Sequence, residues 1–486
     1  IRVLRRASAA LIFLLVFFVA LQSIGAQPED DWRKLEKHFK KLPMEARRLT
    51  GPLFWLHGTE SKERLQNYLE IVTESHNGTF CAESRPHRDW LGEGWYRDLG
   101  ICLESARKND LSMWIFDERW WPSGEVAGEV PPKYGAKTLQ AEAVSVEGPG
   151  EYTGDGYGGE HFVAVLAGQT VDGGISGDSL IDLSSKLEDG SLTWEVPDGT
   201  WKIMKFTWKY TDSDPIVVDG ASKRAVNWYL NTVYQPHYDH FPEAFGKTIV
   251  RYFYDEPHTP GDWGTEVIPM MKEWGVDWKK ALAGWKFTLA DGEQAAARYQ
   301  YRRAFAEAWG RTLYGGISRW CHEHDVVSIG HFLEHKGLYL SPEVCAGNMF
   351  QLQKYSEMGG IDLVVRQMYP GQRPHGIYQT PKLGSSISHV YDKPQDLTMC
   401  EIHGAYGQDL AYEEMKWLVD QMQVRGVNFM ITHSFNPKSP WDTDCPPYFY
   451  NGGYEPRYPL YRVWADYTNR LSELLHGGRH VCPVAF

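Results

Sequence analysis

The 486-residue sequence lacks the short motifs that mark several common kinds of site. Its seven cysteines, at positions 81, 102, 321, 345, 400, 445 and 482, never occur as CxxC, so no structural zinc site is indicated. Its histidines show no HExxH spacing. No GxGxxG turn follows the first predicted strand, which disfavours an open dinucleotide-binding sheet. Zinc and dinucleotide sites are therefore not favoured.

Long runs of Lys or Arg are also absent, and the formal net charge is -13. Because phosphate backbones require clustered basic residues, nucleic acid is not an expected partner. An uncharged substrate fits this charge better. The sequence is instead rich in aromatic residues, with 20 Trp and 27 Tyr. Flat aromatic faces suit sugar rings, although most of these side chains will fill a large core.

The N-terminal segment is typical of a secretory signal. Arg2, Arg5 and Arg6 precede an apolar run from Ala9 to Leu21, and small residues stand before Gln27. The apolar run is shorter than the roughly 20 residues that a transmembrane helix needs. We therefore expect residues 1–26 to be a cleaved signal peptide and the mature protein to be periplasmic or secreted, with no stable membrane span.

Strand-like and helix-like segments alternate over most of the chain, which is the pattern of a parallel α/β sheet. Eight strand-like segments can be counted, at 51–58, 78–84, 111–118, 247–257, 326–335, 361–370, 397–404 and 427–435. Eight parallel strands with helices between them predict a closed (β/α)8 barrel, the TIM barrel.

Residues 135–215 interrupt this alternation. They are rich in Gly, Asp, Thr and Val, and they contain turn pairs such as Asp189-Gly190 and Asp198-Gly199. This pattern predicts a β-rich insertion between strands 3 and 4 that packs outside the barrel. The first part of the barrel would then span residues 27–134 and the second part residues 216–486.

Carboxylates stand at the ends of two of the predicted strands. RYFYDEP ends with Asp255 and Glu256 on the fourth strand, and LTMCEIHG carries Glu401 on the seventh. Catalytic groups of such barrels lie at the carboxyl ends of strands, and glycoside hydrolysis uses two carboxylates that flank one bond. We therefore predict Glu256 as proton donor and Glu401 as its partner, acting as base or as nucleophile. Side chains alternate along a strand, so only one of Asp255 and Glu256 should point to the barrel axis, and the other should cap a helix or pair with an arginine such as Arg251.

Further polar and aromatic side chains at strand ends are predicted to bind substrate: His57, Asp117, Glu118, Trp121, Asp255, His331, Glu334, His403 and His433. Imidazole and carboxylate groups could also form a zinc or manganese site. Hydrogen bonding to sugar hydroxyls is the simpler role for them. No metal ligand is therefore assigned.

Four segments carry a resemblance to a known family: FDERWWPSGEVAGE, VDGASKRAVNWYLNTVYQPHYDHFPEAFGKTIVRYFYDEP, RGVNFMITHSF and WADYTNRLSELLHGGRHV. Together they resemble the barrel of glycoside hydrolase family 106, the α-L-rhamnosidases, over roughly residues 50–486. The resemblance implies an inverting exo-hydrolase with its acid at Glu256 and its base at Glu401. It also implies a calcium ion held after the sixth strand, where this sequence reads IDLVVRQMYPG and keeps Asp362. We otherwise expect no cofactor.

Two functions stay open from the sequence. The first is an exported glycoside hydrolase that removes a terminal, rhamnoside-like sugar from a polysaccharide or glycoside. The second is a catalytically inactive barrel that only binds carbohydrate. The presence of both Glu256 and Glu401 favours the first, because a binding protein has no need of two such carboxylates.

Overall fold

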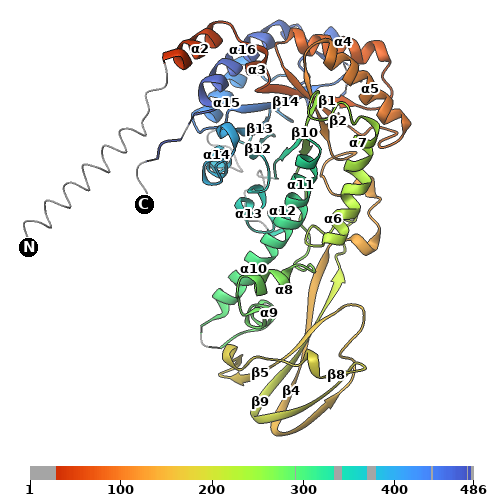
Figure 1. Cartoon of the computed structure of the whole chain (residues 1–486), viewed down its shortest axis with the longest axis vertical. Helices are drawn as coiled ribbons and strands as arrows, with labels where there is room; N and C mark the ends of the chain where they lie inside the picture. Colours follow the sequence, from red (N-terminus) through yellow and green to blue (C-terminus); the bar gives the residue numbers. More distant parts are fainter. Residues whose placement is uncertain are drawn as a thin grey trace, which may run out of the picture.

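The computed structural model describes residues 29–290, 292–332, 342–368, 379–438, 440, 442–478 and 480–482. It consists of a barrel with helices around it and a separate antiparallel sheet that forms the far end of an elongated molecule (Figure 1).

Eight parallel strands form the barrel: β1 (Thr50–Leu56), β2 (Thr79–Ser84), β3 (Ser112–Phe116), β10 (Ile249–Tyr254), β11 (Val327–Gly330), β12 (Gly359–Leu363), β13 (Thr398–Ile402) and β14 (Phe429–Phe435). Their order in the sheet is β11-β10-β3-β2-β1-β14-β13-β12, so each strand lies beside its neighbour in the chain. The predicted (β/α)8 barrel, with the predicted strands in it, is confirmed.

The two end strands, β11 and β12, meet through a side chain. The Gln353 side-chain amide donates to the Gly360 carbonyl at 2.7 Å and accepts from the Gly360 amide at 3.0 Å, and it lies 3.5 Å from the Gly330 carbonyl. Gly360 approaches Gly330 so closely that a Cβ atom at position 360 would overlap the Gly330 carbonyl oxygen. Glycine at this position therefore allows the barrel to close.

The strands are buried on both faces, which explains their continuous apolar runs. Inward-facing side chains from alternate positions, such as Trp55, Trp114, Phe253, Met399 and Ile431, form one core inside the barrel. Side chains from the intervening positions pack against the surrounding helices.

The helices of the structure surround the barrel or connect it to the second sheet (Figure 1). They are α2 (Glu29–Lys40), α3 (Met44–Arg47), α4 (Lys62–Glu74), α5 (Glu93–Lys108), α6 (Lys223–Tyr229), α7 (Gln235–His240), α8 (Val267–Glu273), α9 (Trp278–Lys286), α10 (Gln294–Trp309), α11 (Gly315–Glu323), α12 (Pro342–Cys345), α13 (Met349–Gln353), α14 (Thr380–Val390), α15 (Tyr412–Gln423) and α16 (Tyr458–Leu475). Within the described residues, none is both long enough and apolar enough to cross a membrane.

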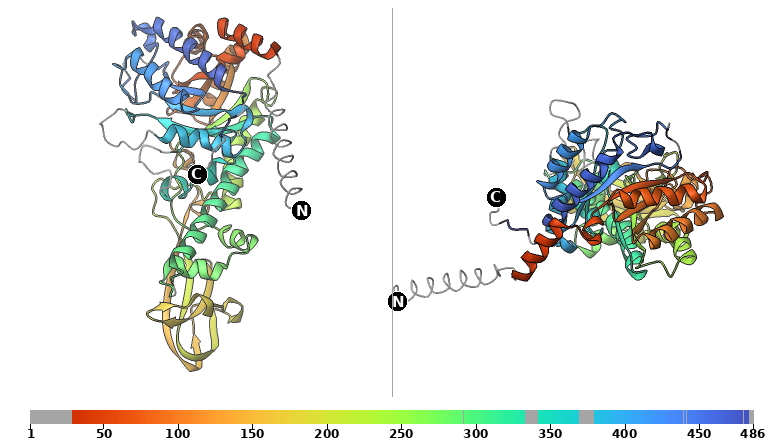
Figure 2. Two further views of the ribbon diagram at one scale, coloured as in Figure 1. Left: turned by 90° about the vertical axis from the view of Figure 1, so that its left-hand side faces the viewer. Right: turned by 90° about the horizontal axis from the view of Figure 1, so that it is seen from above.

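The antiparallel sheet lies between β3 and β10 in the chain, as the sequence predicts. It is built on two long strands, β4 (Lys137–Gly154) and β9 (Ser191–Tyr210), with β5 (Phe162–Val171), β6 (Gly174–Ile175), β7 (Ile181–Asp182) and β8 (Leu187–Glu188). Figure 2 shows it outside the barrel from two further directions. A later segment also packs on it: the Ile175 amide donates to Thr288, and Lys280 pairs with Asp178 at 3.0 Å.

Candidate active site

A cavity of about 180 Å³ lies at the carboxyl ends of the barrel strands. It is lined by Arg85, Trp121, Asp255, Glu256, Asp362, Val364, Val365, Glu401, Gly404, Ala405, His433 and Cys445. Glu256 and Glu401, the two predicted catalytic carboxylates, therefore lie in one cavity with five other ionisable or sulfur-bearing side chains.

The turn after β10 places both of its acidic residues in this cavity. Glu256 has φ +41°, in the left-handed region, so the alternation of a regular strand ends before it. The expectation that only one of Asp255 and Glu256 faces the axis is therefore wrong. So is the suggested pairing with Arg251, which lies near the start of β10, against the rings of Trp114 and Phe429.

Other strained backbone positions line the same cavity. Val365, Ala405 and Cys445 have φ of +48°, +56° and +46° and are cavity residues like Glu256. A left-handed conformation is costly for residues other than glycine, and most of all for a β-branched valine. Strained backbone conformations are common at functional sites, where contacts with the surrounding structure maintain them.

His331 lies between the acidic residues. Its Nε2 is 3.0 Å from Oε2 of Glu401 and 3.3 Å from Oδ1 of Asp255. All three side chains are almost fully buried. His331 is also within 4.8 Å of ligand atoms of Glu256 and Asp362. One imidazole therefore connects the carboxylates that end β10, β12 and β13.

Burial and mutual charge set the protonation of this cluster. Burial raises the pKa of Asp255 well above its ordinary value, and repulsion from Glu401 adds to the rise. Burial acts against ionisation of Glu401 too, but the hydrogen bond and charge of His331 prevail and lower its pKa. The pKa of His331 is raised by Glu401, Asp362 and Asp255 in spite of burial. These directions favour a protonated Asp255, an ionised Glu401 and a cationic His331.

An arginine that the sequence reasoning missed also lines the cavity. Arg85 donates to the buried Glu83 at 2.7 Å and to Asp444 at 2.9 Å, and its guanidinium lies 4.5 Å from the centre of the Trp55 ring. Burial raises the pKa of Glu83 to about 7, with Arg85 opposing the rise. Arg85 directly follows the end of β2 in the segment Glu-Ser-Arg, and this position could have identified it from the sequence. Asp444 lies in a loop, where no comparable pattern marks it.

The predicted substrate-binding residues divide into two groups. Trp121, Asp255 and His433 line the cavity, and His331 contacts its carboxylates. His57 instead pairs with Glu60 at 2.9 Å, and His403 packs against Tyr406, Phe449 and Trp464. Neither is among the cavity-lining residues. Glu334 lies outside the described residues.

Asp117 and Glu118 lie beside the cavity and hold its walls in place. Glu118 accepts backbone N–H groups of Arg119 and of residues 124–127 at 2.7 to 3.2 Å, which fixes the loop that carries Trp121. Asp117 accepts the hydroxyls of Ser123, Tyr229 and Tyr234 at 2.5, 3.0 and 2.6 Å. Ser123 in turn exchanges two 2.8 Å hydrogen bonds with the backbone of Asp255. A buried network therefore supports the Asp255–Glu256 turn.

We expect Tyr234→Phe to lower kcat by about tenfold while KM changes by less than about twofold. Loss of the hydroxyl removes one of the hydrogen bonds that Asp117 accepts. Asp117 then holds Ser123 less firmly, and with it the turn that carries Glu256. Small misplacements of a reacting group are costly, about 10²-fold for 1 Å. The measurement is steady-state kinetics on an aryl glycoside that the wild type cleaves.

Tyr301→Phe is the matched control, because Tyr301 is also buried and donates one hydrogen bond, at 2.7 Å to the carbonyl of Asp262. Both variants should lose about 1 kcal/mol of folding free energy. Equal kcat values for the two variants would show that the Asp117 network only stabilises the fold.

Two groups of three side chains are close enough to share a metal ion: Asp255 with His331 and Glu401, and Glu256 with His331 and Asp362. Calcium takes six to eight oxygen ligands. Each group contains two carboxylates and the imidazole of His331, which offers a nitrogen in place of an oxygen. Among the described residues these donors match calcium poorly, and no step of the reaction is derived through it.

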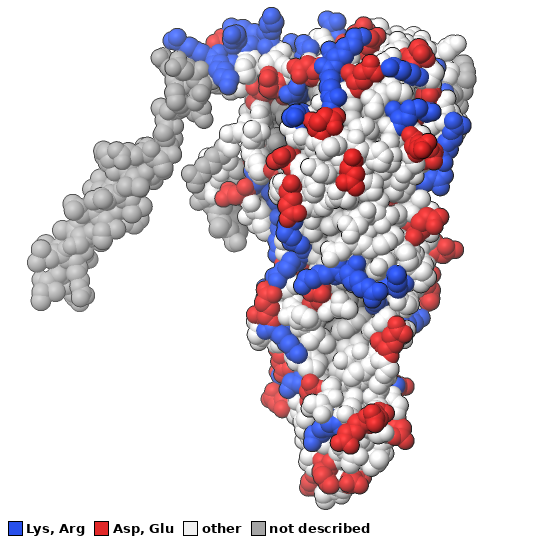
Figure 3. Space-filling view, turned by 45° about the vertical axis from the view of Figure 1, so that its right-hand side comes forward, with Lys and Arg blue, Asp and Glu red and all other residues white. Residues whose placement is uncertain are grey.

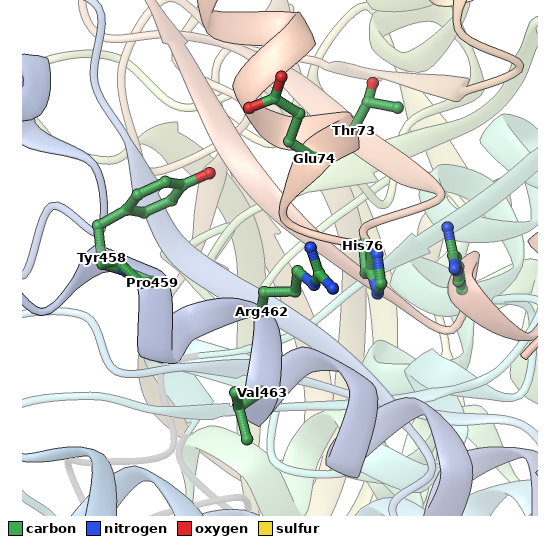
Figure 4. A pocket seen from close by; sticks show the side chains of 8 residues that line it. Thr73, Glu74, His76, Tyr458, Pro459, Arg462 and Val463 are labelled. Atoms are coloured by element: carbon green, nitrogen blue, oxygen red, sulfur yellow. The ribbon is translucent and has the colours of Figure 1, made fainter.

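A wider hollow, of about 770 Å³, lies on the outside of the barrel between the end of α4 and the start of α16 (Figure 4). It is lined by Arg47, Thr73, Glu74, His76, Tyr458, Pro459, Arg462 and Val463. Glu74 is the one acidic residue among them, so two-carboxylate hydrolysis has no basis there. The cavity at the strand ends is therefore the candidate active site because of its carboxylates, although the outer hollow is larger.

Comparison with known proteins identifies the family. The family model described as Glyco_hydro_106, alpha-L-rhamnosidase, matches residues 159–486. The chain belongs to this family. The resemblance to this family is confirmed, and three of the four sequence segments that carry it lie within the matched residues. A search of curated proteins finds no match to the chain.

A solved rhamnosidase structure has the same fold. A rhamnosidase from Novosphingobium sp. PP1Y matches with a TM-score of 0.70 and 17% identity, over 92% of this chain and 61% of that one. A β-galactosidase from the haloarchaeon Halorubrum lacusprofundi matches with a TM-score of 0.48 and 9% identity, over 89% and 59% of the two chains. The chain thus spans about three fifths of the length of these proteins.

Proposed function

We propose that this chain is the catalytic part of a periplasmic or secreted glycoside hydrolase that removes a terminal, α-L-rhamnose-like sugar. The observation that carries the proposal is the presence of Glu256 and Glu401 in one cavity at the carboxyl ends of β10 and β13. Membership of the family supports the sugar class. The N-terminal signal-like segment supports export.

In the proposed reaction Glu256 donates a proton to the oxygen of the leaving group. Glu401, kept ionised by His331, removes a proton from the attacking water. Attack of water on the far face of the sugar gives inversion, which the family resemblance implies. Proton NMR during the first turnovers tests this step, since an α-glycoside must release the β-sugar first if the enzyme inverts.

The size of the cavity favours removal of one terminal sugar. Its volume of about 180 Å³ is below the roughly 300–1,000 Å³ of pockets for drug-sized ligands. Trp121, which is 41% exposed, lies at its edge and offers a flat face for the sugar or for the next unit.

The alternative is a barrel that binds carbohydrate without cleaving it. The ionised Glu401 beside the cationic His331 argues against it, because a binding site gains nothing from an activated base. A panel of aryl glycosides decides between the two functions. Release of the aryl group from an α-L-rhamnoside supports hydrolysis, and saturable binding without release supports the inactive barrel.

We expect His331→Gln to move the low-pH limb of the kcat/KM profile to higher pH. Glu401 must be ionised to act as base, and the charge of His331 lowers its pKa. Without that charge the pKa of Glu401 rises, so activity is lost earlier as the pH falls. The variant should therefore lose several-fold more activity at pH 5 than at pH 7, relative to the wild type.

His76→Gln is the control for this experiment. His76 also pairs with a carboxylate, Asp466 at 2.7 Å, but it lies in the outer hollow of Figure 4. Its profile should coincide with that of the wild type. An unshifted low-pH limb in His331→Gln would contradict the role of Glu401 as base.

A further inference from the structure

A second cavity, of about 700 Å³, lies at the amino-terminal mouth of the barrel, the end opposite Glu256 and Glu401. Leu49, Ser112, Val250, Leu397 and Phe429, which stand at the starts of five barrel strands, form its floor. Residues of α2 and of the end of α16 form its sides. The proposed reaction makes no use of this cavity.

Basic side chains dominate its lining. The charged and titratable residues are Lys34, Arg48, Lys247, Arg251, His38, His476, Glu45 and Glu473. Glu473 is already engaged, 2.7 Å from His38 and 3.7 Å from His476. Four fixed positive charges thus face two negative ones, in a protein whose net charge is -13. Figure 3 shows Lys and Arg interspersed with Asp and Glu over the barrel end of the molecule, so the excess of basic residues is a local property of the cavity.

Arg251 is the distinctive residue of the cavity. It comes from β10, and its guanidinium carbon lies 5.3 Å from the ring centres of both Trp114 and Phe429. Its Nε is buried and has no hydrogen-bond partner among the described residues, and the same holds for Nε of Arg48. Burial lowers the pKa of Arg251 to about 10; the negative charge of Glu357 opposes this effect, and the positive charge of Arg48 adds to it. Two guanidinium groups therefore lie near each other with donors left over.

Burying hydrogen-bond donors without partners costs folding free energy. A buried donor without a partner costs about 1–3 kcal/mol, and more if it is charged. Arg48 already pairs with Asp110 at 2.9 Å through one of its terminal nitrogens, whereas among the described residues Arg251, Lys247 and Lys34 form no ion pair with a carboxylate. An anion seated between the two arginines would satisfy their donors and relieve their repulsion.

We propose that this cavity binds a tetrahedral oxyanion, phosphate or sulfate, through Arg48 and Arg251, with Lys34 and Lys247 adding charge from the rim. The planar fork of arginine matches the oxygen geometry of such groups and forms paired hydrogen bonds with them. The anion is either a free ion or a sulfate or phosphate group carried by a carbohydrate. The site is independent of the proposed hydrolase activity.

Isothermal titration calorimetry of the whole chain with inorganic phosphate and with inorganic sulfate, at low ionic strength, tests the proposal. We expect one site with a Kd below about 1 mM, weakening as NaCl is added because salt screens the charges. Arg251→Met should weaken binding by at least about tenfold. Methionine is of similar length and keeps contact with Trp114 and Phe429.

Thermal unfolding separates this role from a structural one. Without an anion, Arg251→Met should be at least as stable as the wild type, because it removes a charge that burial disfavours, that Arg48 repels and that forms no ion pair among the described residues. Only the wild type should gain in Tm when phosphate or sulfate is added. Lys247→Met changes an exposed residue of the same cavity, so it keeps the proposal testable if Arg251→Met fails to fold, and it should weaken binding severalfold.

Lys416→Met is the matched control, since Lys416 is exposed, pairs with Asp420 at 2.7 Å and lies outside the cavity. Binding equal in the wild type and both cavity variants, or no binding at all, would overturn the proposal. Comparison of inorganic sulfate with glucose 6-sulfate distinguishes the two sources. Tighter binding of the sugar ester indicates a group on a carbohydrate, and equal or weaker binding indicates the free ion.

Discussion

Replacing Glu401 by glutamine should lower kcat on an aryl α-L-rhamnoside by about 10³-fold or more, with KM little changed. General base catalysis contributes about 10²–10⁴-fold, and glutamine cannot accept the proton of the attacking water. The substitution keeps the size of the side chain in the cavity. It also removes the carboxylate that lies 3.0 Å from His331. Steady-state kinetics at the pH optimum of the wild type measure the effect.

Glu104→Gln is the control for Glu401→Gln, because Glu104 is an exposed glutamate that pairs with Lys62 at 2.9 Å. It should retain full activity. Circular dichroism and thermal unfolding must show that Glu401→Gln is folded. A folded variant that retains more than about a tenth of the wild-type kcat would exclude Glu401 as base. Glu334, which the sequence also places at a strand end, would then be the next candidate.

Glu256→Gln should affect substrates according to their leaving groups. For a natural-type glycoside, whose leaving oxygen needs a proton, we expect kcat to fall by about 10²–10⁴-fold. For an aryl glycoside with a strongly acidic leaving group, such as dinitrophenol, the fall should be less than about tenfold. The difference follows because an acidic phenol departs without help from an acid. Rates on both substrates, measured with the same enzyme preparation, give the comparison.

The two substrates serve as internal controls for each other, since a folding defect lowers both rates equally. Equal losses would assign Glu256 to binding and not to proton donation. In that case the protonated Asp255, whose pKa is raised by burial and by Glu401, becomes the candidate acid. Asp255→Asn would then show the dependence on the leaving group that Glu256→Gln lacks.

The barrel was predictable from the sequence because its physical cause is local. A parallel strand that is buried on both faces must be apolar over most of its length, as LSMWIF and VNFMITHSF are. Eight such segments with helices between them allow few other folds. The antiparallel sheet was predictable for a similar reason, since Asp-Gly turns and alternating short runs are local signals.

Part of the site was predictable through the same logic. Polar residues that end buried strands of a barrel meet at one mouth, so Glu256, Glu401, His331 and His433 could be named from their positions. Which of these residues share a cavity could not be predicted from the sequence. His57 and His403 also end strands, yet they turn toward Glu60 and toward Phe449 and Trp464.

The sequence by itself determined the strand order, the position of the insertion and the two strand ends that carry Glu256 and Glu401, because these depend on patterns within short segments. Only the tertiary structure decided that Asp255 and Glu256 both face the cavity, since this depends on the left-handed backbone at Glu256. It also decided that Arg85 joins the site and that His331 connects Asp255 with Glu401. Such contacts join residues far apart in the chain, and their charges and protonation follow from burial, which no single segment encodes.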